Sequence, residues 1–322
     1  MGAQWSQFFP PKPTFSPDDF GPQDGKVFIV TGGSSGIGFE LTKILYRKNA
    51  TVYIAARSKD KTEQAMADIR ADSPNSKGRL EFLSLQLEDL ASIKESVQQF
   101  TSKESKLHVL WNNAGVSQPP LGSVSKQGIE LQLATNCLGP FLFTQLLLPT
   151  LKATAGAEDA TPPRVVWLSS QIVELSAPRG GIIMDEIRTP PNDKGKNYTS
   201  SKAGNWFLSA ELARRSGPDG IISVALNPGA VSTNLFRHTP WLTYLAWPLL
   251  YTADMGALTE LFAGLSPDIT ANNNGCYVVP WGKISENPRE DIVLAMKPKD
   301  EGGNGVSAEF WEFCLEKTKD YM

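Results

Sequence analysis

The stretch "VFIVTGGSSGIG", residues 27–38, decides the fold of this chain of 322 residues. It begins with a short apolar run rich in β-branched side chains, which is typical of a buried strand. Gly32, Gly36 and Gly38 follow, and from Ile37 onward apolar residues recur at helical spacing. Glycines between a strand and a helix allow a tight turn and let backbone amides approach a pyrophosphate at the helix N-terminus. The stretch therefore predicts the start of a dinucleotide-binding βαβ unit.

Further apolar strands alternate with helical stretches along the rest of the chain. Because strands that are apolar throughout are covered on both faces, this pattern favours an α/β fold with a parallel sheet. We predict a single Rossmann-type, doubly wound domain of about seven strands over residues 25–322, after an extended proline-rich arm over residues 1–24. The predicted strands lie at residues 27–30, 51–56, 80–85, 108–114, 164–170, 223–229 and 275–282.

Composition excludes several classes of function. With 20% charged residues and a net charge of -3, the chain has no general affinity for nucleic acid. Its three cysteines are far apart and it has only two histidines, which argues against a metal site or a Ser-His-Asp triad. Sparse thiols indicate a reducing compartment, so we expect a cytoplasmic protein. We expect no signal peptide and no membrane span, because no run approaches about 18 apolar residues.

Five further motifs follow the glycine turn. In this order they resemble the short-chain dehydrogenase/reductase superfamily, and the resemblance covers about residues 26–281. A long insert before Tyr198 and the C-terminal sequence are similar to its retinol-dehydrogenase-like branch, particularly to fungal members. The motifs are "NNAG" (112–115), "TNCLGP" (135–140), "LSS" (168–170), "YTSSK" (198–202) and "NPGAVST" (227–233).

The resemblance implies a catalytic set of Asn136, Ser170, Tyr198 and Lys202. Tyr198 would exchange a proton with the substrate oxygen, Ser170 would hold that oxygen, and Asn136 would support a water-linked proton route. Tyr198 and Lys202 are four residues apart, hence on one face of a helix. A free tyrosine titrates near pH 10, and we expect the Lys202 ammonium to lower this pKa. Ser169 is the rival for the serine role.

The resemblance also implies a set of residues that contact the cofactor. Gln86 stands where many relatives carry an aspartate that binds the adenine amino group, and a glutamine carbonyl can accept the same bond. The implied residues are Gly32, Ser34, Ser35, Gly36, Ile37, Gly38, Arg57, Gln86, Leu87, Asn113, Ala114, Gly115, Tyr198, Lys202, Pro228, Gly229, Val231 and Thr233.

Arg57 bears on the choice of cofactor. The strand "TVYIAA" (51–56) ends at the expected ribose edge without a carboxylate, which in related sites binds the 2′-hydroxyl of NAD. Arg57 instead presents a planar, charged fork suited to phosphate. We therefore predict NADP(H) as the cofactor. A solvated arginine at a strand end is the alternative.

An apolar segment, "NLFRHTPWLTYLAWPLLY" (234–251), is the predicted lid over the substrate. A lid of this kind indicates a lipophilic ligand. Packing on the core or on a partner subunit, as in a homodimer, and insertion into a membrane interface stay open. The start "MGAQWS" also fits the myristoylation pattern, so peripheral membrane contact is a further open prediction.

The predicted function is NADPH-dependent reduction of a lipophilic aldehyde or ketone, such as an intermediate of secondary metabolism. Two alternatives stay open. One is the NADP⁺-dependent oxidation of a retinoid- or steroid-like alcohol. The other, from a different class, is a scaffold that binds NADP without turnover; such proteins typically lose the tyrosine or the lysine, and both are present here.

Overall fold

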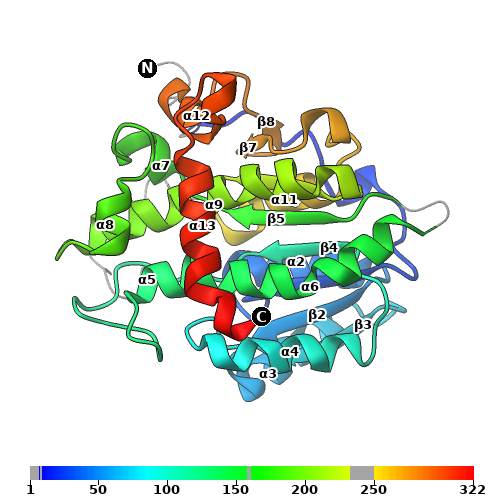
Figure 1. Ribbon diagram of the computed structural model, residues 1–322. Helices are drawn as coiled ribbons and strands as arrows, with labels where there is room; N and C mark the ends of the chain where they lie inside the picture. The colour runs from blue at the N-terminus through cyan, green and yellow to red at the C-terminus, as the bar shows by residue number, and fades with distance from the viewer. Residues whose placement is uncertain (1–6, 8, 158–160, 233–249) are drawn as a thin grey trace.

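The computed structural model describes residues 7, 9–157, 161–232 and 250–322, and an eight-stranded sheet lies at its centre (Figure 1). The strand order is β3-β2-β1-β4-β5-β6-β7-β8, and all neighbouring pairs are parallel except β7 and β8. This confirms the predicted α/β class. The strands are β1 (Val27–Thr31), β2 (Thr51–Ala56), β3 (Arg79–Ser84), β4 (Val109–Asn112), β5 (Arg164–Leu168), β6 (Ile222–Leu226), β7 (Tyr277–Val279) and β8 (Lys283–Ile284).

Strand β8 is the one element that the expected seven strands lack. It spans two residues, pairs Ile284 with Val278 of β7, and runs antiparallel to that strand. Its exposed Lys283 gives it no apolar run, so no strand pattern marks it in the sequence.

Helices cover both faces of the sheet, because side chains along each strand alternate between two hydrophobic clusters. In β1, Ile29 joins the cluster with α4, α6, α9 and α13, whereas Phe28 and Val30 join the cluster with α2, α3 and α11. The helices are α2 (Gly36–Arg47), α3 (Lys59–Asp72), α4 (Leu90–Thr101), α5 (Leu131–Leu133), α6 (Gly139–Ala155), α7 (Gln171–Ser176), α8 (Met184–Arg188), α9 (Lys194–Ser216), α11 (Ala253–Leu265), α12 (Glu290–Met296) and α13 (Val306–Thr318).

A continuous helical run over Leu131–Ala155 joins α5 to α6 through a π-helical turn. Of the residues that the structure describes, it is the one span with the length and hydropathy to cross a membrane, contrary to the expectation that none would qualify. However, 78% of its most apolar window is buried inside the protein. Its apolar side chains therefore fill the core between α4, α9 and the sheet.

The N-terminal arm packs against the body of the protein from Gln7 onward, as far as it is described. Phe15 is buried, stacks on Phe20 at 5.7 Å between ring centroids, and meets the edge of Phe262 of α11 at 6.1 Å. Thr14 Oγ1 donates a hydrogen bond of 2.8 Å to the Gly282 carbonyl, next to β8. Proline-rich sequence predicted an irregular arm, but not these long-range contacts.

Candidate active site

The glycine turn lies at the carboxyl end of β1, against the loop that follows β4. Gly32 has a φ of 70°, and a Cβ there would lie 3.2 Å from the Cα of Ala114. Thr31 ties the two loops together, since its Oγ1 accepts a 2.9 Å hydrogen bond from the Ala114 amide. Ser35 is the N-cap of α2 without a side-chain capping bond to the described first turn. The backbone amides of this turn are therefore suited to an anionic pyrophosphate.

The structure brings most of the expected cofactor residues to this same edge of the sheet. After β1, Ser34 is half-buried and Ser35 exposed. After β3, Gln86 is exposed and Leu87 is buried under Gly139 of α6. The loop after β6 holds half-buried Pro228 and Gly229 and buried Val231. Thr233 and nearly all of the expected lid lie outside the described residues. The other members, Gly36, Ile37 and Gly38, begin α2, and Asn113, Ala114 and Gly115 follow β4.

Arg57 follows β2 and has a side chain that is 58% exposed. Its Nη1 forms an ion pair of 2.5 Å with Oε1 of Glu88, which follows the neighbouring strand β3. Strand register explains the pairing, since Ala56 lies opposite Ser84 at the ends of β2 and β3. The sequence reasoning did not identify Glu88. Its place just beyond a parallel neighbour of β2 was the signal that could have done so.

Tyr198 and Lys202 lie in the first turns of α9, where Asp193 caps the helix by accepting hydrogen bonds from Gly195 and Lys196. The Tyr198 side chain is buried, and the side chains of Ser170 and Ser117 interact with its hydroxyl.

Burial raises the pKa of Tyr198 to about 12, although the bonds with Ser170 and Ser117 oppose the rise. The prediction that Lys202 lowers the pKa of Tyr198 is therefore wrong for this structure. The loss of hydration on burial raises this pKa by more than the neighbouring side chains lower it. The Nζ atom of Lys202 lies 5.9 Å from the centre of the Tyr198 ring. At neutral pH the phenol keeps its proton.

The two adjacent serines have different partners. Ser170 is the N-cap of α7, where its Oγ accepts a 3.3 Å hydrogen bond from the Ile172 amide, and it contacts the Tyr198 hydroxyl. Ser169 points elsewhere and donates a 2.9 Å bond to the backbone carbonyl of Lys202. Ser117 was not identified from the sequence, although it lies only two residues beyond the "NNAG" motif. The structure thus gives Tyr198 two hydroxyl partners.

The side chain of Lys202 lies beside Gly115. Its Nζ donates a 2.9 Å hydrogen bond to the Leu168 carbonyl at the end of β5, and burial lowers its pKa to about 8. A Cβ at Gly115 would lie 3.4 Å from this Nζ and 3.1 Å from Oδ1 of Asn136. Gly115 therefore lies directly against both side chains, and a larger residue at this position would crowd them.

Asn136 lies in the π-helical turn and holds the loop after β4. Its Oδ1 accepts a 2.8 Å bond from the Val116 amide, and its Nδ2 donates to the Val116 carbonyl at 3.0 Å and to Ser201 Oγ at 2.9 Å. Both amide N–H groups are thus engaged by the protein. The water-linked proton route through Asn136 stays a prediction.

Glu260 of α11 is a buried acid that the sequence reasoning did not identify. Neither of its carboxyl oxygens has a hydrogen-bond partner among the described residues. Burial raises its pKa to about 8, and attraction to the Lys202 ammonium opposes the rise. Because Glu260 and Lys202 are both buried and interact, the protonation state of each depends on that of the other.

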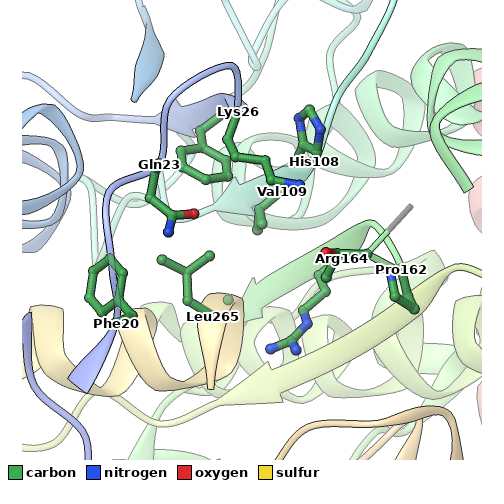
Figure 2. Close-up of a pocket in the computed structure, with 11 residues that line it drawn as sticks. Phe20, Gln23, Lys26, His108, Val109, Pro162, Arg164 and Leu265 are labelled. Carbon is green, nitrogen blue, oxygen red and sulfur yellow. The ribbon is translucent and has the colours of Figure 1, made fainter. Parts of the chain in front are cut away.

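A cavity of about 230 Å³ lies at the opposite, amino edge of the sheet (Figure 2). Lys26, His108 and Arg164 line it, at the starts of β1, β4 and β5. The Arg164 guanidinium donates to the carbonyls of Ala263, Ser266 and Ile269 at 2.9–3.2 Å, and so caps the end of α11. His108 accepts a 3.0 Å bond from the Val27 amide. These basic groups therefore hold the fold together, far from Tyr198.

Metal chemistry has no candidate ligands here: within the described ranges, no group of three or more His, Cys, Asp or Glu could hold a metal ion.

Comparisons with known proteins agree with the site. A family model described as short chain dehydrogenase matches residues 26–182. The chain is 44% identical over 324 residues to the short-chain dehydrogenase/reductase iacJ of Pestalotiopsis fici, covering 99% of this chain and 98% of that protein. It is 46% identical over 327 residues to a short-chain dehydrogenase/reductase of Phomopsis amygdali, covering 99% and 97%.

Among solved structures, the NADPH-bound carbonyl reductase from chicken fatty liver shares the fold, with a TM-score of 0.61 and 23% identity over 83% of this chain and 99% of that chain. The sequence relatives and the catalytic edge together identify the family. The chain belongs to the short-chain dehydrogenase/reductase family and is an oxidoreductase that uses a nicotinamide dinucleotide.

Proposed function

We propose that this enzyme reduces the carbonyl group of a lipophilic aldehyde or ketone with NADPH, on an intermediate of the kind found in fungal secondary metabolism. The observation that carries the proposal is the buried Tyr198 phenol, which holds its proton at neutral pH and contacts Ser170. Carbonyl reduction needs a proton donor at the oxygen, and a neutral phenol supplies one.

We assign different roles to the residues at the carboxyl ends of the strands. The turn at Gly32, the backbone at Gly115 and the Lys202 ammonium would hold the dinucleotide. When bound, its nicotinamide ring supplies the hydride. Ser170 orients the substrate oxygen, and Tyr198 donates its proton to that oxygen as charge develops there. Ser117 stabilises the phenolate that remains, because its hydroxyl already contacts Tyr198.

Arg57 supports NADPH over NADH. Its present partner is Glu88, and an exposed ion pair of this type is worth about 0–1 kcal/mol. A hydrogen bond to a charged group is worth about 1.5–3 kcal/mol, so a 2′-phosphate would compete successfully for the guanidinium. The fork of Arg57 suits a phosphate, whereas NADH offers it only a neutral hydroxyl.

A lipophilic substrate is supported by the apolar composition of residues 234–251. We also propose a cytoplasmic location, which the three free cysteines support; Cys137 and Cys314 are buried. Peripheral membrane contact is part of the same proposal. Fractionation of a tagged protein, with and without Gly2, would test it.

Two other functions fit the site less well. Oxidation of an alcohol would use the same residues in reverse, with Tyr198 as the proton acceptor, so our choice of reduction rests on the preference for NADPH that Arg57 supports. A scaffold without turnover has no use for a contact among Ser170, Ser117 and Tyr198 in the core of the site.

The test is the purified protein with NADPH and a panel of hydrophobic aldehydes and ketones, followed by the loss of nicotinamide absorbance. We expect turnover that falls at least 100-fold in Tyr198→Phe, while NADPH affinity stays within about threefold. Wild-type turnover in the variant would overturn the role of Tyr198. Tight NADPH binding without oxidation across the panel would favour the scaffold.

A further inference from the structure

Gln7, in the N-terminal arm, bridges two segments of the catalytic edge. Its Nε2 donates a 2.6 Å hydrogen bond to Oε2 of Glu174, and its Oε1 accepts a 2.9 Å bond from Nδ2 of Asn227. All three side chains are buried. The amide thus uses its donor and its acceptor at once, on partners from two distant parts of the chain.

Both partners adjoin residues of the active site. Glu174 lies in α7, the short helix that Ser170 caps. Asn227 follows β6, and its Oδ1 accepts a 2.9 Å bond from the Gly229 amide, so it shapes the loop expected to face the nicotinamide. Gln7 therefore links the helix behind the serine to the loop behind the cofactor.

The charges around Glu174 favour an amide at position 7. Burial raises the pKa of the Glu174 carboxyl, while the Gln7 bond and the positive charge of Arg289 lower it. Arg289, before α12, also donates 3.0 Å bonds to the carbonyls of Val173 in α7 and of Ala177, the C-cap of that helix. Tyr277 of β7 faces the same carboxyl, and its pKa is raised well above the ordinary value by burial and by Glu174.

We propose that Gln7 is a positioning residue for catalysis: it fixes α7 relative to the loop after β6, and so sets where Ser170 lies with respect to the nicotinamide. The substitution Gln7→Ala removes both bonds. The substitution Gln7→Glu keeps an acceptor for Asn227, but it brings a second carboxylate against Glu174. The kinetic part of the test rests on the proposed reductase activity.

Three variants test the proposal, with Gln23→Ala as the matched control. Gln23 is a glutamine of the same arm whose side chain, as far as the chain is described, bonds within the arm to the Gly21 and Pro22 carbonyls. We expect Gln7→Ala and Gln7→Glu to lower kcat about 10- to 100-fold, as a displaced catalytic group does, with NADPH Kd within about threefold.

The double variant Gln7→Glu with Glu174→Gln should recover most of the lost kcat. In this variant the amide that Glu174→Gln introduces and the Asn227 amide both donate to the new carboxylate at position 7. The bridge therefore re-forms, with the direction of its hydrogen bond to position 174 reversed. A role of residue 7 that does not act through this bridge predicts no such recovery. Gln23→Ala should keep wild-type kcat.

Hydrogen–deuterium exchange gives a readout that does not depend on turnover. Gln7→Ala should speed amide exchange at least tenfold in residues 171–177 and 227–231, and Gln23→Ala should not. If the wild type reduces no carbonyl but exchange responds as expected, the proposed function fails and the bridge stands. Unchanged exchange in Gln7→Ala, unchanged kcat, or no recovery in the double variant overturns the proposal.

Discussion

The substitution Glu260→Gln should stabilise the protein, and increasingly so as pH rises. Burial raises the pKa of the Glu260 carboxyl from 4.5 to about 8. Between these values the folded state binds a proton that the unfolded state has lost, so wild-type stability falls as pH rises through this range. A glutamine side chain has nearly the same shape and does not titrate, hence it avoids this loss.

The magnitude follows from the shift. One pKa unit corresponds to about 1.4 kcal/mol, and the interval from pH 5 to pH 8 covers most of the difference between the two pKa values. The gain in unfolding free energy from Glu260→Gln should therefore be roughly 3 kcal/mol larger at pH 8 than at pH 5. For a chain of this size that corresponds to about 4–5 °C in Tm.

Thermal and urea unfolding of wild type and Glu260→Gln at pH 5, 6, 7 and 8 would measure this difference. Glu95→Gln, the same substitution at an exposed position, provides the control. A gap between wild type and Glu260→Gln that does not grow with pH would refute the reasoning, because the carboxyl would then be hydrated or paired in the folded state.

Three further predictions concern the cofactor. Arg57→Ala should weaken NADPH binding about 10- to 100-fold and NADH binding less than threefold, measured as Kd by nicotinamide fluorescence; equal losses would remove Arg57 from the phosphate site. Glu88→Gln should tighten NADPH about two- to fivefold, because the phosphate no longer competes with a carboxylate worth up to about 1 kcal/mol, and looser binding would show that Glu88 orients Arg57 instead. The kcat/KM for NADPH should fall about tenfold per unit above pH 8, where Lys202, with its pKa lowered to about 8, loses its proton; a flat profile to pH 9.5 would contradict a charged Lys202 in cofactor binding.

The fold was predictable from the sequence wherever strands were apolar throughout. β1 and β6 show this, since all of their residues are buried and they read as continuous hydrophobic runs. The spacing of Tyr198 and Lys202 placed them on one helix face, and motif position distinguished Ser170 from Ser169. Strand β8 was not predicted, because it has only two residues, one of them an exposed lysine, and so shows no run of apolar residues.

The unpredicted parts of the site depend on tertiary contacts. Ser117, Glu88 and Glu260 each act through partners from other parts of the chain, which spacing along the sequence does not reveal. The direction of the Tyr198 pKa shift was wrong for a related reason. A neighbouring lysine is visible in the sequence, whereas the depth of burial that opposes it is set by the whole fold.

The bridge made by Gln7 also constrains the order of events during synthesis. Gln7 leaves the ribosome before its partners Glu174 and Asn227, which follow 167 and 220 residues later. At about 5–20 residues per second, the arm waits roughly ten seconds or more before both can be reached. During that time β1 and β2 can already pair, since their contacts are local. The bridge therefore joins a residue made early to two residues made much later, and it can form only after β6 has been synthesised.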